Sequence, residues 1–434
     1  MNNSRREFIK KSVLGTAFMA MGGVGMSARS YKNIVGANER VNIAVIGLGR
    51  RLDAFVAPLG NKENNVRVHS LCDVMESQRI KGLGKFSEIL SYSPRLENDV
   101  RKIQEDKEVD ALLHLTPDHW HAPGTCYAVQ AGKHVYVEKP CSHNPREGEM
   151  LLEFQKKYKK VIQVGNQARS SDKTIEIIKE IHNGLIGDTY EAIAFYTNTR
   201  GEVPVAQPAP VPRGLDWNLF QGPAPRQDYT HDTWDYNWHW YGWTYGTAES
   251  GNNMIHRYDL ARWAMQLDYP EQVEVNAGKK HFLDDGWTMY DTMNAVFRFP
   301  GGKIIKCDCK SRSGYRTYGS NNGAIIFGTK GTAFLTGNIY KIYDREGNLV
   351  KEDASKLDDV NLHFVNFINS IRGKTTVNSS VVEAEKSTLL CHLANISYRI
   401  GKNFNVDSRT GKAIDSEALK LWSREYEPGW EPKL

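Results

Sequence analysis

A pair of glycines at the end of an apolar run is the first feature of this sequence that could do chemistry. Residues 41–46 read VNIAVI and predict a strand, and Gly47-Leu48-Gly49 follows directly, ahead of a helix-like segment. This arrangement brings the backbone close to a pyrophosphate and presents helix N-terminal amides to it. Leu52 replaces the third glycine of G-x-G-x-x-G, which alters helix-to-strand packing and keeps the phosphate site. The predicted pyrophosphate-binding residues are Gly47, Leu48, Gly49, Arg50 and Arg51.

An acid follows the second predicted strand. Residues 66–71 form an apolar run that ends at Cys72-Asp73, and Asp73 lies 26 residues after Gly47. The acid that binds the adenosine ribose usually lies about 20 residues on, so Asp73 fits with a slightly longer helix and loop. A carboxylate facing the ribose 2′ position repels a 2′-phosphate, and no Arg or Lys follows within two positions. Asp73 therefore favours NAD over NADP, with an ordinary surface-turn aspartate as the alternative interpretation.

The run Asp118-His119-Trp120-His121 is a second polar cluster and could suggest a metal site. Two histidines and one acid are too few ligands, and polar residues are common where a helix begins, so we expect no metal there. The six cysteines contain no C-x-x-C pair, so neither a zinc site nor a redox motif is indicated. Cys307 and Cys309 fall in a strand-like run and are interpreted as ordinary small residues.

Two polar clusters, at residues 118–121 and 138–140, follow predicted strands, and strands and helices alternate around them. Residues 109–115 predict a strand, residues 122–131 a helix and residues 134–137 another strand, which leads into Glu138-Lys139-Pro140. Alternating strands and helices are typical of a doubly wound parallel sheet, in which ligands bind at the carboxyl ends of the strands. We therefore predict an α/β protein with an N-terminal Rossmann domain.

The order of these motifs resembles the Gfo/Idh/MocA oxidoreductase family. The G-x-G opening, Thr116-Pro117 with the histidine cluster, and Glu138-Lys139-Pro140 recur in that order, and the likeness runs from about residue 40 to the end. It implies that Lys139 is catalytic, lying between nicotinamide and substrate and exchanging a proton with a sugar hydroxyl, because a confined lysine beside a cation can have a lowered pKa. The cofactor contacts that it implies are Thr116, Pro117, His119, Trp120, His121, Glu138 and Lys139.

The resemblance extends to two later motifs. In Gly165-Asn166-Gln167-Ala168-Arg169 it implies a cofactor contact at Asn166, and we expect Arg169 at the substrate. Residues 251–259 resemble the family's G-x-x-x-x-H-x-x-D helix, which implies that His256 is catalytic and that Lys139, Asn252 and His256 bind substrate. The family has an acid where Asn252 stands, and an amide cannot ionise, so a relay through a carboxylate is in doubt. A core helix histidine is the alternative for His256.

An aromatic run in the second half could bind a sugar. Residues 234–245 hold four tryptophans and three tyrosines, after a Pro-rich stretch at residues 203–212. Aromatic faces stack on the apolar faces of pyranose rings, so Tyr241 and Trp243 are expected to bind substrate. An aromatic core or a subunit interface is the alternative interpretation.

Consecutive strand-like runs follow at residues 190–197, 272–277, 292–299, 303–310, 324–328 and 332–335, with helices at residues 361–372 and 382–400. Hairpin signals between the later runs predict a large open, mostly antiparallel sheet in a C-terminal α/β domain. The resemblance implies that this sheet makes a homodimer or homotetramer.

Composition sets the outer limits. The chain has 434 residues, 40% hydrophobic and 25% charged, with a net charge of +5, which predicts two globular domains. Basic residues are interspersed with acids, so no nucleic-acid partner is expected. We predict a leader at residues 1–38, an NAD-binding domain at residues 39–165, and a substrate-binding and oligomerisation domain at residues 166–434.

The leader resembles a bacterial export signal. Arg5-Arg6 precedes a mildly apolar, Gly-rich stretch at residues 13–26 and small residues around Ala28, which is typical of the twin-arginine pathway. The stretch is too short for a clear membrane span. We expect a periplasmic protein, cleaved near Ala28 or tethered to the membrane, with a basic, frayed N-terminus as the alternative.

Two enzymatic functions and one nonenzymatic function follow from these features. The first is an NAD-dependent oxidoreductase of a sugar, glycoside or polyol that carries tightly bound cofactor, since free NAD is not supplied outside the cytoplasm. The second is a glycoside hydrolase that oxidises a hydroxyl transiently, eliminates the aglycone and reduces the ring again. A branch resembling the family works in this way but often lacks the lysine that is present here as Lys139. The third is an NAD-binding or sugar-binding protein, which the missing acid at Asn252 favours.

Overall fold

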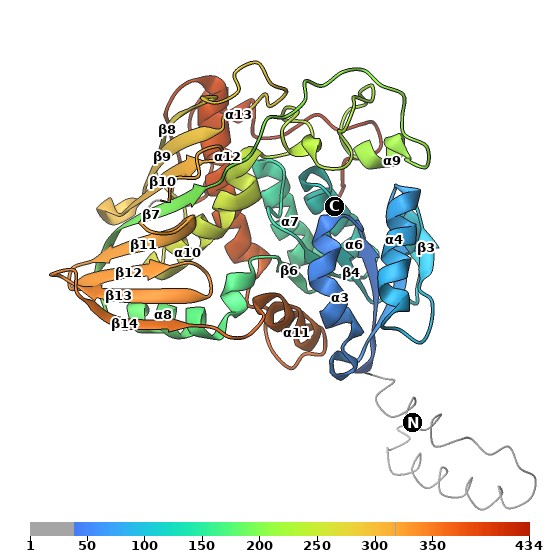
Figure 1. Ribbon diagram of the computed structural model, residues 1–434, viewed down its shortest axis with the longest axis horizontal. Helices are drawn as coiled ribbons and strands as arrows, with labels where there is room; N and C mark the ends of the chain where they lie inside the picture. Colours follow the sequence, from blue (N-terminus) through green and yellow to red (C-terminus); the bar gives the residue numbers. More distant parts are fainter. Residues whose placement is uncertain (1–38, 317) are drawn as a thin grey trace, which may run out of the picture. The chain divides into compact units, whose positions relative to one another are not determined.

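The structure, a computed structural model, describes residues 39–316 and 318–434. The expected export leader at residues 1–38 lies outside the described residues. Within the described ranges, none of the helices combines the length and hydropathy that a membrane span requires. Two sheets organise these residues, one in each half of the chain (Figure 1).

The first sheet is parallel and has the strand order β3-β2-β1-β4-β5-β6. The strand order switches direction between β1 and β4, which is where a doubly wound sheet binds its ligand. The central strands are short, buried apolar runs because helices cover both of their faces. The predicted N-terminal Rossmann fold is confirmed. The strands are β1 (Val41–Ile46), β2 (Val66–Cys72), β3 (Arg95–Glu97), β4 (Ala111–His114), β5 (His134–Val137) and β6 (Ile162–Val164).

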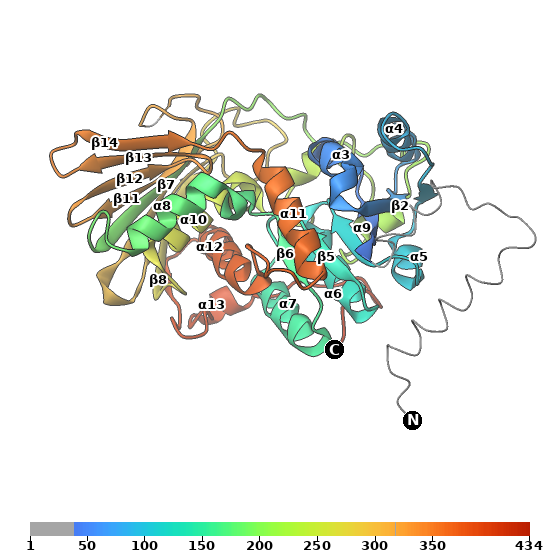
Figure 2. The same cartoon turned by 90° about the horizontal axis from the view of Figure 1, so that it is seen from below.

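Helices from both halves of the chain cover this sheet. On one face, Phe55 of α3 and Phe367 of α11 pack edge-on against Tyr136 of β5. On the other face, α6 and α7 contribute buried residues such as Val129 and Phe154. Figure 2 shows α11 beside α3, although it lies about 300 residues later in the chain. The helices of the first half are α3 (Asp53–Gly60), α4 (Glu76–Ser87), α5 (Val100–Glu105), α6 (Asp118–Gln130) and α7 (Pro145–Tyr158).

The second sheet has the strand order β14-β13-β12-β11-β7-β10-β9-β8-β15. Its pairs are antiparallel except for β10 with β7, which confirms the predicted C-terminal sheet. The sequence did not predict β14 because this edge strand is mostly exposed and lacks an apolar alternation. The strands are β7 (Thr189–Thr197), β8 (Gln272–Gly278), β9 (Thr292–Arg298), β10 (Ile304–Lys310), β11 (Asn322–Gly328), β12 (Gly331–Leu335), β13 (Ile339–Asp344), β14 (Leu349–Ala354) and β15 (Phe404–Asn405).

Helices α8, α10 and α12 pack against one face of the second sheet and enclose the largest apolar core of the described chain (Figure 2). Helix α12 also reaches α7, so the two halves share packing contacts. Because α11 and α12 contact the first half, the predicted domain boundary after residue 165 stays a prediction. The helices of the second half are α8 (Asp172–His182), α9 (Trp217–Gln221), α10 (Ile255–Met265), α11 (Asp359–Ile371), α12 (Val381–Ile400) and α13 (Ser416–Leu419).

A long connection between β7 and α10 reaches from the second half back to the first sheet. We call residues 203–245 of this connection the cover segment. The amide of Asp216 donates to Val74 O at 3.0 Å and the amide of Glu76 donates to Gly214 O at 2.9 Å, so the cover segment adds backbone hydrogen bonds beside the end of β2. Its buried apolar residues form a small cluster with Met75, which fixes the cover segment over the carboxyl ends of the strands.

Candidate active site

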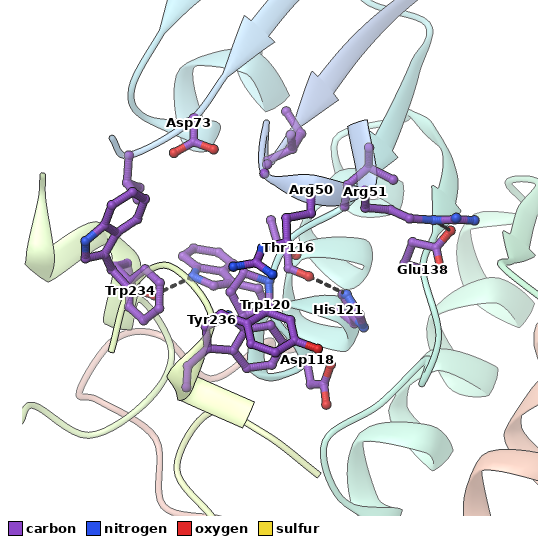
Figure 3. Close-up of a pocket in the computed structure, with 18 of the residues that line it drawn as sticks. Arg50, Arg51, Asp73, Thr116, Asp118, Trp120, His121, Glu138, Trp234 and Tyr236 are labelled. Carbon is purple, nitrogen blue, oxygen red and sulfur yellow. Dashed lines mark hydrogen bonds and ion pairs between the residues drawn. The ribbon is translucent and has the colours of Figure 1, made fainter. Parts of the chain in front are cut away.

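A cavity of about 560 Å³ opens at the carboxyl ends of β1, β2, β4 and β5 (Figure 3). Residues of the first sheet form one side, and residues 219–239 of the cover segment and the start of α10 form the other. This volume lies within the range of sites for cofactors and drug-sized ligands. In Figure 3, Asp73 lies toward one end of the cavity, and His121 and Glu138 lie toward the other.

The glycine turn after β1 leaves room for a ligand at the backbone. Gly47 has φ +85°, and a Cβ there would lie 2.7 Å from Leu115 O, so only glycine fits this close approach of β1 to β4. Gly49 lines the cavity, and among the described residues no atom lies within 4 Å of the position of its Cβ. The turn fits the predicted pyrophosphate because it is a bare backbone facing an open cavity.

Asp73 fixes the same turn from the end of β2. Its carboxylate accepts from the amide of Leu48 at 2.7 Å and from the amide of Met75 at 2.8 Å. Burial raises the pKa of Asp73, and these two amides and Arg79 oppose that rise. Asp73 lines the cavity, whereas the Leu48 side chain is buried in the core and only its backbone serves the turn.

Two consecutive arginines leave the turn in different directions. Arg50 reaches the cover segment, where its guanidinium lies 3.3 Å from the Asp235 carboxylate and 4.4 Å from the centre of the Tyr236 ring. Arg51 Nε donates to Glu138 Oε1 at 2.8 Å. Although burial opposes it, Arg51 holds the pKa of Glu138 below its ordinary value. Figure 3 shows the Arg51–Glu138 pair. Glu138 therefore joins the first loop to the end of β5.

The histidine cluster divides into residues inside and outside the cavity. Trp120 and His121 line it, together with Thr116, Pro117 and Asp118, which precede them. The His121 ring lies between Thr116 O and Pro140 O, each at 2.7 Å, so it braces the loop that carries Lys139. His119 does not line the cavity. Its Nε2 meets Phe220 O at 2.9 Å, and burial lowers its pKa to about 3, so His119 positions the cover segment.

Both ring nitrogens of His121 contact carbonyl oxygens, whereas His119 uses its Nε2 on Phe220 O and its Nδ1 is buried without a partner among the described residues. Elsewhere in the described chain, His69, Asp106 and Glu108 bring three ligand atoms within 4.8 Å of one another. Arg95 donates to Asp106 at 2.8 Å, so a guanidinium already supplies positive charge to this cluster.

Lys139 lies where the two walls of the cavity meet. Its Nζ donates to Asn252 O at 2.5 Å, which links the end of β5 to the turn before α10. Burial lowers the pKa of Lys139, and the carboxylates of Glu138, Asp118 and Glu249 oppose that shift. A lowered pKa makes the neutral amine, and hence proton exchange, more accessible.

His256 and Asn252 line the cavity on the same side. Burial, together with Lys139, Arg257 and Arg51, lowers the pKa of His256 well below its ordinary value, so its imidazole is neutral and has one donor and one acceptor. Asn252 contributes its backbone carbonyl to Lys139 and its amide to the cavity lining. The structure thus brings Lys139, Asn252 and His256 together.

Besides Leu48 and His119, four further predicted ligand contacts lie outside the cavity lining. Arg169 makes a two-bond ion pair with Asp259, both bonds at 2.8 Å, and both side chains are buried. Tyr241 donates to Pro204 O at 2.8 Å. Trp243 packs under Arg399 of α12, and Asn166 is buried within the turn after β6. These residues pack the two walls, and none contributes a surface to the cavity.

Several lining residues were missed by the sequence analysis. The aromatic run does contribute, but through Trp234, Tyr236 and Trp238 with His239, and no sequence feature separates these from Tyr241 and Trp243. Asn253 was missed because no sequence motif singled it out. Helical spacing from Glu249 to Asn252 and Asn253 is the one pattern that could have revealed their contact. The missed residues are Gln78, Asn98, Gln167, Trp234, Asp235, Tyr236, Trp238, His239 and Asn253.

A dinucleotide turn joined to a lysine, amide and histidine cluster defines a nicotinamide-dependent oxidoreductase of the two-domain type. Family models match both halves of the chain: "Oxidoreductase family, NAD-binding Rossmann fold" at residues 41–166 and "Oxidoreductase family, C-terminal alpha/beta domain" at residues 194–431. The chain therefore belongs to the Gfo/Idh/MocA family.

Individual relatives are more distant. D-glucoside 3-dehydrogenase of Escherichia coli is 21% identical over 380 residues, which cover 83% of this chain and 95% of that protein. Alpha-N-acetylgalactosaminidase of Shewanella oneidensis is 22% identical over 220 residues, 45% of this chain, and the match spans only 46% of that protein. A solved levoglucosan dehydrogenase with NADH and levoglucosan aligns over 84% of this chain and 99% of its own, with a TM-score of 0.64 and 15% identity, which shows the shared fold.

Proposed function

We propose that this protein is an NAD-dependent oxidoreductase of a sugar, glycoside or polyol, with Lys139 as its proton-transfer residue. The observation that carries the proposal is the position of Lys139 Nζ, 2.5 Å from Asn252 O and inside the cavity that begins at the glycine turn. When bound, a nicotinamide supplies the acceptor or donor of a hydride. Oxidising a carbinol then requires a group that takes the hydroxyl proton. Lys139 is a nitrogen base that lies where the two walls of the cavity meet.

The neighbouring residues set the protonation of Lys139 and hold the substrate. Burial favours the neutral amine of Lys139, whereas Glu138 and Asp118 favour its charged form. His256 is neutral and can donate to or accept from a hydroxyl without adding charge. In this scheme, Lys139 moves the proton, and His256 and Asn252 orient the hydroxyl that loses it.

The preference for NAD over NADP rests on Asp73. Its carboxylate lines the cavity while both of its oxygens accept amides of the chain. A 2′-phosphate placed beside this carboxylate meets a like charge in a partly buried site, whereas a 2′-hydroxyl can donate to it.

The cover segment supports tight retention of the cofactor. Arg50 crosses from the glycine turn to Asp235 and Tyr236, and Trp234, Trp238 and neighbouring residues line the opposite wall. A ligand in the cavity would therefore lie between these two walls. Retention suits the expected export by the twin-arginine pathway and a periplasmic location, which we propose on the basis of the leader residues alone.

The outer face of the second sheet supports assembly of a homodimer or homotetramer. Phe195 of β7 stacks on Phe334 of β12 and meets the ring of Tyr318 at 5.4 Å, while Tyr318 and Tyr315 remain 56% and 81% exposed. Both tyrosines lie in the connection between β10 and β11, and exposed aromatic side chains beside a sheet are typical of an interface.

A glycoside hydrolase that oxidises its substrate transiently is the second candidate, favoured by the similarity to the Shewanella glycosidase. Retained NAD suits it equally, because the cofactor is restored in each cycle.

The distinguishing experiment adds a panel of neutral sugars, glycosides and polyols to the purified protein without free cofactor. Accumulation of the near-ultraviolet band of reduced nicotinamide, with a keto product in the mass spectrum, supports the oxidoreductase. Release of aglycone without that band supports the hydrolase. Absence of both leaves a binding protein and contradicts the proposal.

A further inference from the structure

The cavity wall opposite the glycine turn contains two neighbouring asparagines on a π-helical turn. Residues Ser250–Met254 form this turn directly ahead of α10, and π-helical turns occur frequently at functional sites. Asn252 and Asn253 both line the cavity. The turn lies close to Lys139 because Gly251 has no side chain: a Cβ there would lie 1.9 Å from Thr247 Oγ1 and 3.2 Å from Pro140 Cγ.

Both asparagine amides are anchored by one buried acid. Asn252 Nδ2 donates to Glu249 Oε1 at 3.3 Å, and Asn253 Nδ2 donates to the same oxygen. The Glu249 side chain is fully buried, and Arg200 holds it with bonds of 2.8 Å and 3.3 Å. Arg200 and Glu249 therefore form an ion pair away from water.

The carboxylate determines which way the amides face. An ionised carboxylate only accepts hydrogen bonds, so each asparagine must turn its NH2 group toward Glu249. The Oδ1 atom of each amide then points away from Glu249. Among the described residues, neither Oδ1 receives a hydrogen bond, and neither is a buried atom without a partner. The wall therefore offers two adjacent acceptors beside the Lys139 donor.

We propose that Glu249 is a positioning residue that makes the substrate end of this cavity a receptor for two adjacent hydroxyl donors, that is, for a vicinal diol. One hydroxyl of a sugar or polyol donates to Asn252 Oδ1 and its neighbour to Asn253 Oδ1. The inference rests on the proposed function and narrows its substrate class. It also assigns a purpose to the amide at position 252: an acid there would face Glu249 with a second negative charge and could not donate to it.

The test measures which hydroxyl protons the protein requires. The probes are methyl β-D-glucopyranoside and its 2-, 3- and 4-deoxyfluoro analogues, whose binding to the NADH complex is followed by calorimetry. Fluorine cannot donate, so fluorination at two adjacent positions is expected to weaken binding about tenfold or more each. In Glu249→Gln the amides can turn their NH2 groups toward the fluorine, so that penalty is expected to shrink to about threefold or less.

A matched control separates positioning from stability. Glu147 is also buried and is paired with an arginine, Arg424, at 2.7 Å, but it does not line the cavity. In Glu147→Gln, fluorine at each ring position is expected to weaken binding by the same factor as in wild type, even if the melting temperature of the variant falls. A merely structural role for Glu249 predicts weaker binding of every probe with an unchanged pattern.

The outcomes separate this inference from the proposed function. An equal affinity for all four probes, or a penalty pattern that is the same in Glu249→Gln as in wild type, overturns the inference and leaves the oxidoreductase standing. If NADH binds and none of the four sugars does, both the inference and the sugar assignment are overturned.

Discussion

The two ends of the cavity are built in different ways. The cofactor end consists of a contiguous turn, Gly47 to Arg51, with Asp73 after the next strand accepting from the Leu48 amide. The substrate end collects Lys139 after β5, Asn252 from the turn before α10, His256 from α10 itself, and aromatic residues from the cover segment. A site made by one backbone turn is determined by local sequence, whereas a site made by distant side chains depends on how the two halves pack.

The largest effect is expected at Lys139, where the two ends meet. Lys139→Met removes the proton-transfer group, so turnover of the sugar substrate should fall about 10²-fold to 10⁴-fold, while NADH affinity changes little. Steady-state kinetics and NADH fluorescence measure the two quantities. Lys81→Met, at an exposed position on α4, serves as the control. Undiminished turnover in Lys139→Met contradicts the role of Lys139.

The next effect concerns stability at the substrate end. Arg169→Met leaves the Asp259 carboxylate buried without its partner, so the free energy of unfolding should fall by about 3–5 kcal/mol. The folded fraction should keep its substrate KM, because Arg169 does not line the cavity. Denaturant titration and kinetics check both points. The double variant Arg169→Met/Asp259→Leu should recover part of the loss, and a raised KM with normal stability would place Arg169 back at the substrate.

A smaller effect is expected at the cofactor end. Asp73→Asn keeps an acceptor for one backbone amide but loses the negative charge, so the ratio of NAD to NADP affinity should fall about tenfold to a hundredfold. Calorimetry with each cofactor measures the ratio. Asp53→Asn, at an exposed position on α3, is the control. An unchanged ratio in Asp73→Asn would show that another group selects the cofactor.

The smallest effect, per pH unit, lies in the pH profile of sugar oxidation. The neutral amine of Lys139 accepts the proton, and burial lowers its pKa while Glu138, Asp118 and Glu249 oppose this and Arg51 reinforces it. The rate should therefore rise about tenfold per pH unit below that pKa and level off before the ordinary lysine value. Sugar reduction needs the ammonium form and should show the opposite slope. A profile that still rises at the ordinary lysine pKa excludes Lys139 as the base.

The sequence predicted the cofactor end because its information is local. The strand, the glycine spacing and the acid at Asp73 each follow from backbone geometry. Spacing could not tell which aromatic residues of the cover segment reach the cavity, since Tyr236 and Tyr241 differ only in how the connection turns after β7. The sequence led us to expect Arg169 at the substrate. In the fold it pairs instead with Asp259, which lies 90 residues later in the chain. Helix α11 packs on the first sheet for a similar reason: its apolar face matches Tyr136, which no pattern in the chain relates to it.

The central claim is that hydride passes between nicotinamide and a carbinol carbon at the junction marked by Lys139. The most direct measurement uses the sugar or polyol that the panel identifies, deuterated at its oxidised carbon, in a single turnover on the NAD-loaded protein, followed by mass spectrometry of the released nicotinamide cofactor. The account predicts that the deuterium appears in the cofactor, and that it does so far more slowly in Lys139→Met. Deuterium that stays wholly in the sugar or is lost to solvent contradicts it.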